Sequence, residues 1–138
     1  MAVDNINKAL YTLVTGGANI TSIIGTRFYP GKLPQNPTYP AATYILISGQ
    51  DRFNVMGVDA DIARKRFRIT CWAEDDETLH SLAEVIRQRV QRFRGTIGTV
   101  EWLDSFIEFE RQDWDDDLKI WQYTMDFRII HRESEAQT

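Results

Sequence analysis

The feature that most constrains the fold is a long alternation of apolar and polar residues near the end of the chain. The apolar residues on alternate positions are Trp121, Tyr123, Met125, Phe127 and Ile129. Successive side chains of a strand point to opposite faces, so this spacing predicts a strand over residues 119–132 with one buried face. Such a strand requires a sheet and a layer that covers it.

Further segments are typical of strands. Residues 27–29 read as a short extended piece, and a proline-rich loop over residues 30–40 follows them. Residues 41–48 are apolar at nearly every position, which predicts an interior strand covered on both faces. Residues 64–73 alternate, with Phe67, Ile69 and Cys71 on one face and arginines on the other. The sheet is therefore expected to have four or five strands.

The last predicted strand pairs within a hairpin. Residues 96–111 are extended, and their apolar phase changes near Asp104-Ser105, which predicts a bulge. The acidic run over residues 113–117 then predicts a turn into the final strand. The two strands form a long C-terminal β-hairpin, and residues 133–138 are expected to be a flexible tail.

Two main helices are predicted by apolar residues at helical spacing. The first follows Asp4, a predicted N-cap, and closes at Gly16-Gly17; a further turn capped by Asn19 closes at Gly25. The second begins at the acidic residues 74–77 and continues to Gly95. Its apolar stripe is Leu79, Leu82, Ala83, Ile86, Val90 and Phe93. These elements predict an α+β fold with two main helices on an antiparallel-dominated sheet.

Composition excludes several classes of protein. A chain of 138 residues with 43% hydrophobic residues can bury one core, so residues 1–138 are expected to form a single domain. Its net charge of -4 argues against non-specific binding of nucleic acid or anionic membranes. A single cysteine, Cys71, excludes a disulfide framework and a thiolate zinc site. With neither a leader nor a membrane span in the sequence, we expect a cytosolic protein.

One acidic cluster is a candidate metal site. Asp113, Asp115, Asp116 and Asp117 supply the oxygen ligands that Ca²⁺ and Mg²⁺ prefer. They lack the glycine and the terminal glutamate of an EF-hand loop. The other interpretation, which we favour, is a solvated hairpin turn that binds no metal.

Two segments are candidate subunit or partner interfaces. Arg64, Arg66 and Arg68 share one face of a predicted strand, and they can pair with carboxylates of the same chain or of a neighbouring subunit. No aromatic residues interleave them, which argues against direct nucleic-acid recognition. Residues 49–62 predict a long loop that carries isolated apolar residues. The apolar residues of this loop expected at an interface include Phe53, Val55 and Met56.

Catalytic groups are not evident in the sequence. Cys71 belongs to an apolar strand face, and neither His80 nor His131 has a serine or cysteine in a nucleophile-like setting. Gly16-Gly17 follows a helix, whereas a phosphate-binding loop would follow a strand. We therefore expect no catalytic residue and no cofactor.

Several strings together suggest a family. They are IGTRFYP at residues 24–30, NPTYPA at 36–41, FRITCWA at 67–73 and DFRIIHR at 126–132. Their content and order resemble the tail terminator, or tail completion, proteins of long-tailed bacteriophages. The resemblance spans nearly the whole chain and rests on strand cores and turns. It also extends to related particles such as gene-transfer particles and phage-tail-like bacteriocins.

The resemblance implies a structural virion protein without enzymatic activity. Such a protein assembles in the bacterial host cytoplasm as a hexameric ring that caps the tail tube at the head-proximal end of the tail. Its implied partners are the tail tube protein and the head–tail connector protein, while DNA passes through the ring without sequence-specific binding. Two alternatives from the residues alone remain, a metal-dependent hydrolase that uses Asp113 to Asp117 and a monomeric binding module.

Overall fold

The computed structural model describes residues 5–50, 54–55, 58–59 and 62–133. Its helices are α1 (Ile6–Thr15), α2 (Ala18–Ile24) and α3 (Asp76–Val90). Its strands are β1 (Phe28–Pro30), β2 (Ala41–Gln50), β3 (Asn54–Val55), β4 (Val58–Asp59), β5 (Ile62–Ala73), β6 (Gly95–Ile97), β7 (Val100–Asp115) and β8 (Ile120–Glu133). In these ranges no helix is long and apolar enough to cross a membrane.

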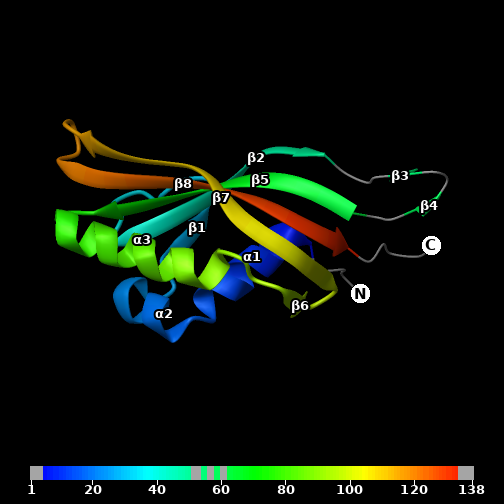
Figure 1. Cartoon of the computed structure of the whole chain (residues 1–138). Helices are drawn as coiled ribbons and strands as arrows, with labels where there is room; N and C mark the ends of the chain where they lie inside the picture. The colour runs from blue at the N-terminus through cyan, green and yellow to red at the C-terminus, as the bar shows by residue number, and fades with distance from the viewer. Residues whose placement is uncertain (1–4, 51–53, 56–57, 60–61, 134–138) are drawn as a thin grey trace.

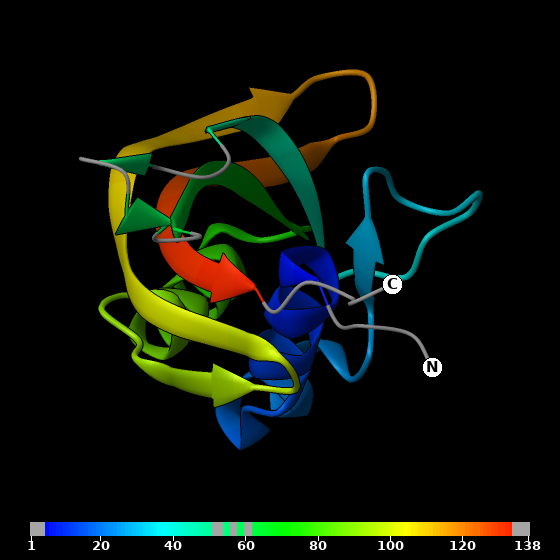
Figure 2. The same cartoon turned by 90° about the vertical axis from the view of Figure 1, so that its right-hand side faces the viewer.

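Six of the strands form one mixed sheet in the order β1-β2-β5-β8-β7-β6. Only the β1–β2 pair is parallel; the other four pairs are antiparallel. Strand β7 curves along its length (Figure 2), and its pairing with β8 shifts register between Trp102 and Asp104 and between Ile107 and Phe109. Strands β3 and β4 pair with each other as a separate two-stranded sheet.

All three helices lie on the same side of the sheet (Figure 1). The residues of β5 and β8 that face them, Phe67, Ile69, Cys71, Met125, Phe127 and Ile129, are fully shielded from solvent. Each helix adds an apolar stripe, and α3 adds Leu79, Leu82, Ala83, Ile86 and Val90. The predicted core faces of both strands are therefore confirmed, and their burial is the main driving force for this arrangement.

The fold class is α+β, as predicted, but the number of elements differs. The sheet has six strands, where four or five were expected, and it is mixed because β1 runs parallel to β2. The two short strands β1 and β6, of three residues each, carry too little sequence pattern to predict their pairing. The expected further turn over residues 19–24 is a helix of its own, α2, whose N-cap is Gly17 and in which Asn19 is an interior residue.

Other boundaries also differ from expectation. The N-cap of α1 is Asn5, whose side chain accepts a hydrogen bond from Lys8 N at 2.9 Å, and Asp4 lies outside the described residues. Helix α3 ends at Val90 and not at Gly95, so Phe93 follows the helix. Strand β7 continues to Asp115, which places the turn of the hairpin at residues 116–119. The predicted loop over residues 49–62 contains β3 and β4.

Candidate functional site

The face of the sheet opposite the helices, here called the outer face, carries an unusual mixture of charged and apolar residues. Strand register places its residues in rows across the sheet. One row joins Ile45, Arg68, Asp126 and Phe109, and the next joins Ser48, Arg66, Arg128 and Phe106. Because the helices lie on the other side (Figure 1), no helix covers this face.

At the centre of the outer face a carboxylate is shared by two arginines. Asp126 is fully shielded from solvent and accepts hydrogen bonds from Arg66 Nε at 3.0 Å and from Arg68 Nε at 2.8 Å. The two arginine side chains remain 30% and 39% exposed. We call these three residues the arginine cluster. It keeps a net positive charge, because two guanidinium groups share one carboxylate.

The arginines also determine the ionisation of Asp126. Burial by itself opposes the charged form of this carboxyl, but the hydrogen bonds from Arg68 and Arg66 outweigh it and lower the pKa of Asp126. The same hydrogen bond raises the pKa of Arg68. Asp126 is therefore ionised at neutral pH, and its hydrogen bonds hold the two arginine side chains over the outer face.

A shallow groove of about 340 Å³ adjoins the cluster. Its lining residues are Arg64, Phe106, Glu108, Arg128 and Ile130. Arg128 Nε donates to Glu108 Oε1 at 3.0 Å, so this part of the groove is an ion pair set between apolar side chains. Such a surface suits contact with a protein better than binding of a small molecule, because the groove is wide and open.

Strand β2 ends in an exposed apolar run. Ile45, Leu46 and Ile47 are 46%, 42% and 42% exposed, although they follow one another in a strand. Strand β1 pairs with β2 only as far as Tyr44. From Ile45 onward, the edge of β2 on which β1 lies therefore has no strand partner among the described residues. The prediction that residues 41–48 are covered on both faces is therefore wrong for the second half of the segment.

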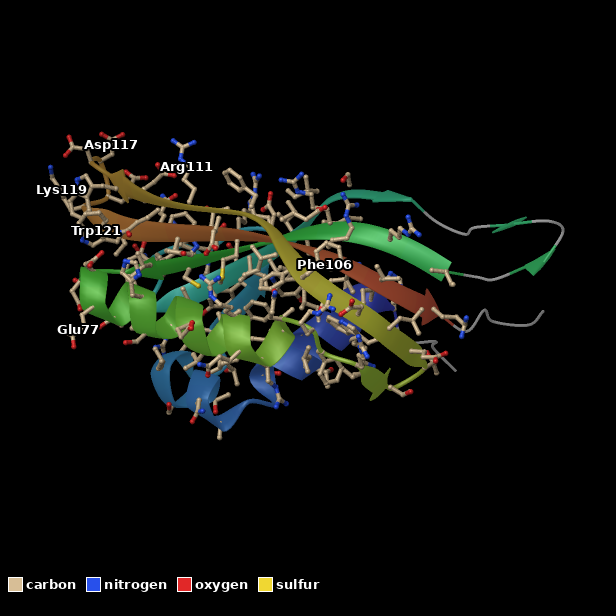
Figure 3. All side chains as sticks on the ribbon, in the orientation of Figure 1. Glu77, Phe106, Arg111, Asp117, Lys119 and Trp121 are labelled. Carbon is tan, nitrogen blue, oxygen red and sulfur yellow. The ribbon has the colours of Figure 1, made fainter. Side chains whose placement is uncertain are left out.

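The tip of the β7–β8 hairpin is a second exposed surface. We define the hairpin tip as residues 114–119, in which Trp114 is 43% exposed and Leu118 58% exposed. Asp115, Asp116 and Asp117 lie between these two residues in the sequence, and Lys119 Nζ lies 3.0 Å from Asp116. Figure 3 shows Asp117 and Lys119 at the same end of the molecule as Glu77, which lies at the start of α3 on the helix side.

Helix α3 supports the base of this hairpin. Glu110 accepts hydrogen bonds from Arg87 Nη1 at 3.2 Å and from the Tyr123 hydroxyl at 2.6 Å. The contact with Arg87, followed by that with Tyr123, lowers the pKa of Glu110. Two residues further along β7, toward the hairpin turn, Gln112 Nε2 donates a hydrogen bond to Asp76 Oδ1 at 2.6 Å. The hairpin is thus attached to the helix up to Gln112, and the tip projects beyond the attachment.

The candidate catalytic and metal-binding residues are not brought together. Among the described residues no three His, Cys, Asp or Glu side chains are placed to hold a metal ion. Asp113 pairs with Arg111 at 3.0 Å, and Asp115 Oδ1 accepts from the backbone N–H of Leu118 at 3.0 Å. Cys71 is fully buried, and its burial raises the pKa of the thiol. The acidic residues therefore act as turn and surface groups in this structure.

The predicted interface residues fall into two groups. Arg64, Arg66 and Arg68 lie together on the outer face, as expected. Of the two predicted kinds of partner, a carboxylate of the same chain or one of a neighbouring subunit, Arg66 and Arg68 have the first, Asp126. Phe53 and Met56 lie outside the described residues, and Val55 is described only as part of β3. Whether these residues form an interface stays a prediction.

Two features of the structure were not predicted from the sequence: the burial of Asp126 and the exposure of Ile45 to Ile47. Asp126 occupies a position of the final strand that the alternation assigned to the polar face, yet it is completely buried. The apolar run Ile45 to Ile47 read as a buried strand, because nothing in the sequence tells how far β1 extends beside it. A signal for Asp126 did exist, since a lone carboxylate on that face can neutralise arginines of a neighbouring strand.

Comparison with known proteins gives one matching family and a similar solved structure. The sequence profile of the family described as tail completion protein gp17 matches residues 8–132. No curated protein matches the chain. Among solved structures, a chain from the virion of a native gene transfer agent particle superimposes with a TM-score of 0.72 at 13% sequence identity, over 94% of this chain and 95% of that chain. At this identity the superposition shows a shared fold.

Proposed function

The chain belongs to the family of tail completion protein gp17, and from this premise we propose that it assembles as a closed ring that caps the tail tube of a phage or phage-like particle. The ring, of six subunits by analogy with the family, occupies the head-proximal end of the tail and joins it to the head–tail connector protein. DNA passes through the ring without sequence-specific contacts. The match over residues 8–132 is the observation that carries this proposal.

The distribution of exposed residues supports assembly. A closed ring uses two different patches of each subunit, one for each neighbour. Exposed large apolar residues of the described surface form two groups, one at Ile45 to Ile47 and one at the hairpin tip, with Phe109 of β7 exposed singly. Both would be unfavourable on a monomer, because exposed apolar side chains at a strand edge and in a turn promote association.

The outer face and the segment between β2 and β5 are the proposed sites of contact with other tail proteins. Arg64 provides a cationic group there, and Phe53, Val55 and Met56 provide apolar ones, whereas Arg66 and Arg68 are left for the contact between subunits. Replacing Phe53 and Met56 together by serine should leave the secondary structure intact and reduce association with tail tubes. A variant with Asn19 and Gln88 replaced by serine, on the helix side, is the matched control.

Assembly and tail completion can be tested directly. The purified chain should form annular particles in negative stain, with a native mass that is a multiple of 16.0 kDa. In a particle-producing strain that lacks the protein, tails should fail to join heads, and expression of the chain should restore joining. A chain that stays monomeric at all concentrations, together with normal joining in its absence, would contradict the proposal.

A further inference from the structure

The outer face and the hairpin tip differ in charge, and both combine charge with exposed apolar side chains. We define the β2 patch as Ile45 and Ile47 together with Arg66 and Arg68 on the adjacent strand. Leu46 is not included, because it is opposite Phe67 and therefore lies on the helix side of the sheet. Register places Arg68 directly beside Ile45 and Arg66 beside Ser48, so cationic groups border the apolar run. The hairpin tip carries Trp114 and Leu118 among the carboxylates of Asp115, Asp116 and Asp117.

The chemistry of the two surfaces is complementary. Each offers apolar side chains that gain free energy when water is removed from them. The β2 patch is cationic because Arg66 and Arg68 share a single carboxylate, Asp126, whereas the tip has three carboxylates and one nearby cation, Lys119. Opposite charge at the border of an apolar contact favours the correct partner and orients it.

The two surfaces of one molecule cannot meet. The β2 patch lies in register with Asp126, and strand β8 runs from Ile120 at the turn to Asp126. At a rise of about 3.3 Å per residue this stretch spans roughly 20 Å. The base of the hairpin is also fixed to α3 through Glu110 and Gln112, so the tip cannot fold back. Figure 1 shows the tip at one end of the molecule, with β2 running toward the other.

We propose that the hairpin tip of one copy docks on the β2 patch of the next copy, with Trp114 and Leu118 against Ile45 and Ile47 and the tip carboxylates near Arg66 and Arg68. This inference rests on the proposed ring and specifies its subunit contact. The contact is heterologous, since it joins two different surfaces, and its repetition closes a ring where the rotation between neighbouring copies is a whole fraction of a full turn.

A mixing experiment tests the direction of this contact. The patch variant I45S/I47S keeps an intact tip, and the tip variant D117K/L118S keeps an intact patch; all four positions are exposed. Each variant alone should lose the assembled species and elute as a monomer. Mixed in equal amounts, they retain one intact contact and should give a heterodimer, and no larger species, in native mass spectrometry. The control N19S/Q88S should assemble like the unmodified chain.

Cross-linking tests the same contact in the assembled protein, so it does not require a heterodimer held by one contact to be stable. In assembled protein, I47C and L118C in the same chain should be joined between subunits by a short thiol-specific cross-linker. I47C combined with S81C, which places the second thiol on exposed Ser81 of α3, should not be joined. Buried Cys71 is protected from the reagent and can be retained.

The outcomes separate the two proposals. If the unmodified chain is monomeric at all concentrations, the ring itself is wrong. If rings form but either variant assembles normally, or I47C and L118C give no cross-link in the rings, the ring stands and the contact assigned here is wrong. Loss of assembly by both variants, with unchanged circular dichroism and a cross-link only in the I47C/L118C chain, supports the contact.

Discussion

Arg66 on β5 donates to the buried carboxylate of Asp126 on β8 at 3.0 Å, across 60 residues of sequence. Arg68 binds the same carboxylate from the directly opposed position. Three charged groups are therefore joined at the centre of an otherwise exposed sheet face. Charge reversal of the arginines would place additional carboxylates beside Asp126, so it would damage the fold as well as any subunit contact. Substitutions of the apolar residues are the cleaner test of assembly.

Replacing Asp126 by asparagine should lower the free energy of unfolding by about 1–3 kcal/mol, because the amide accepts only part of the hydrogen bonding and no longer neutralises the arginines. The matched control is E108Q, which removes the partner of Arg128 in a 3.0 Å pair that is partly exposed. That substitution should cost less than about 1 kcal/mol. Urea unfolding at pH 7 measures both; equal effects would show that burial of Asp126 is unimportant.

The pH dependence of stability should follow from the lowered pKa of Asp126. A carboxyl with a lower pKa in the folded than in the unfolded state stabilises the fold above its unfolded pKa, about 3.9 for aspartate. This contribution should disappear as the pH falls below about 4 and through the folded pKa. Urea unfolding between pH 7 and pH 3 should show a smaller acid-induced loss for D126N than for the unmodified chain. Parallel curves would contradict this assignment.

Replacing Asp115, Asp116 and Asp117 together by asparagine should leave the fold intact. These carboxylates lie at the hairpin turn, and an asparagine at position 115 can still accept the hydrogen bond from Leu118 N. We expect a change in melting temperature of only a few degrees, with unchanged far-ultraviolet circular dichroism. Titration with Ca²⁺ or Mg²⁺ should not stabilise the unmodified chain. Metal-dependent stabilisation that the triple variant loses would instead favour a metal site at the turn.

Cys71 should react with thiol reagents only after unfolding. Its side chain is fully buried in the core, and burial raises the pKa of the thiol, so the reactive thiolate is scarce at neutral pH. A chromogenic disulfide reagent should modify the native chain no faster than the chain unfolds, and should modify it rapidly in concentrated urea. Fast reaction of the folded protein would show that this part of the core opens readily.

The sequence by itself determined the local elements and the faces that they bury. The alternation around Met125 and Phe127 predicts both the strand and its core face, because the period of a strand is a local property of the backbone. The apolar stripe of α3 is predictable for the same reason. The Asp115 to Asp117 run marked the hairpin turn to within a few residues.

Only the tertiary structure decided what happens on the outer face. Asp126 is buried because β5 and β8 pair in a register that brings Arg66 and Arg68 over it, and register is set by contacts between distant segments. Ile45 to Ile47 are exposed on the part of β2 that lies beyond the end of its pairing with β1 at Tyr44, and the extent of that pairing is a tertiary property. Burial at Asp126 and exposure at Ile45 to Ile47 both depend on neighbours remote in sequence, so the pattern within each segment by itself does not reveal them.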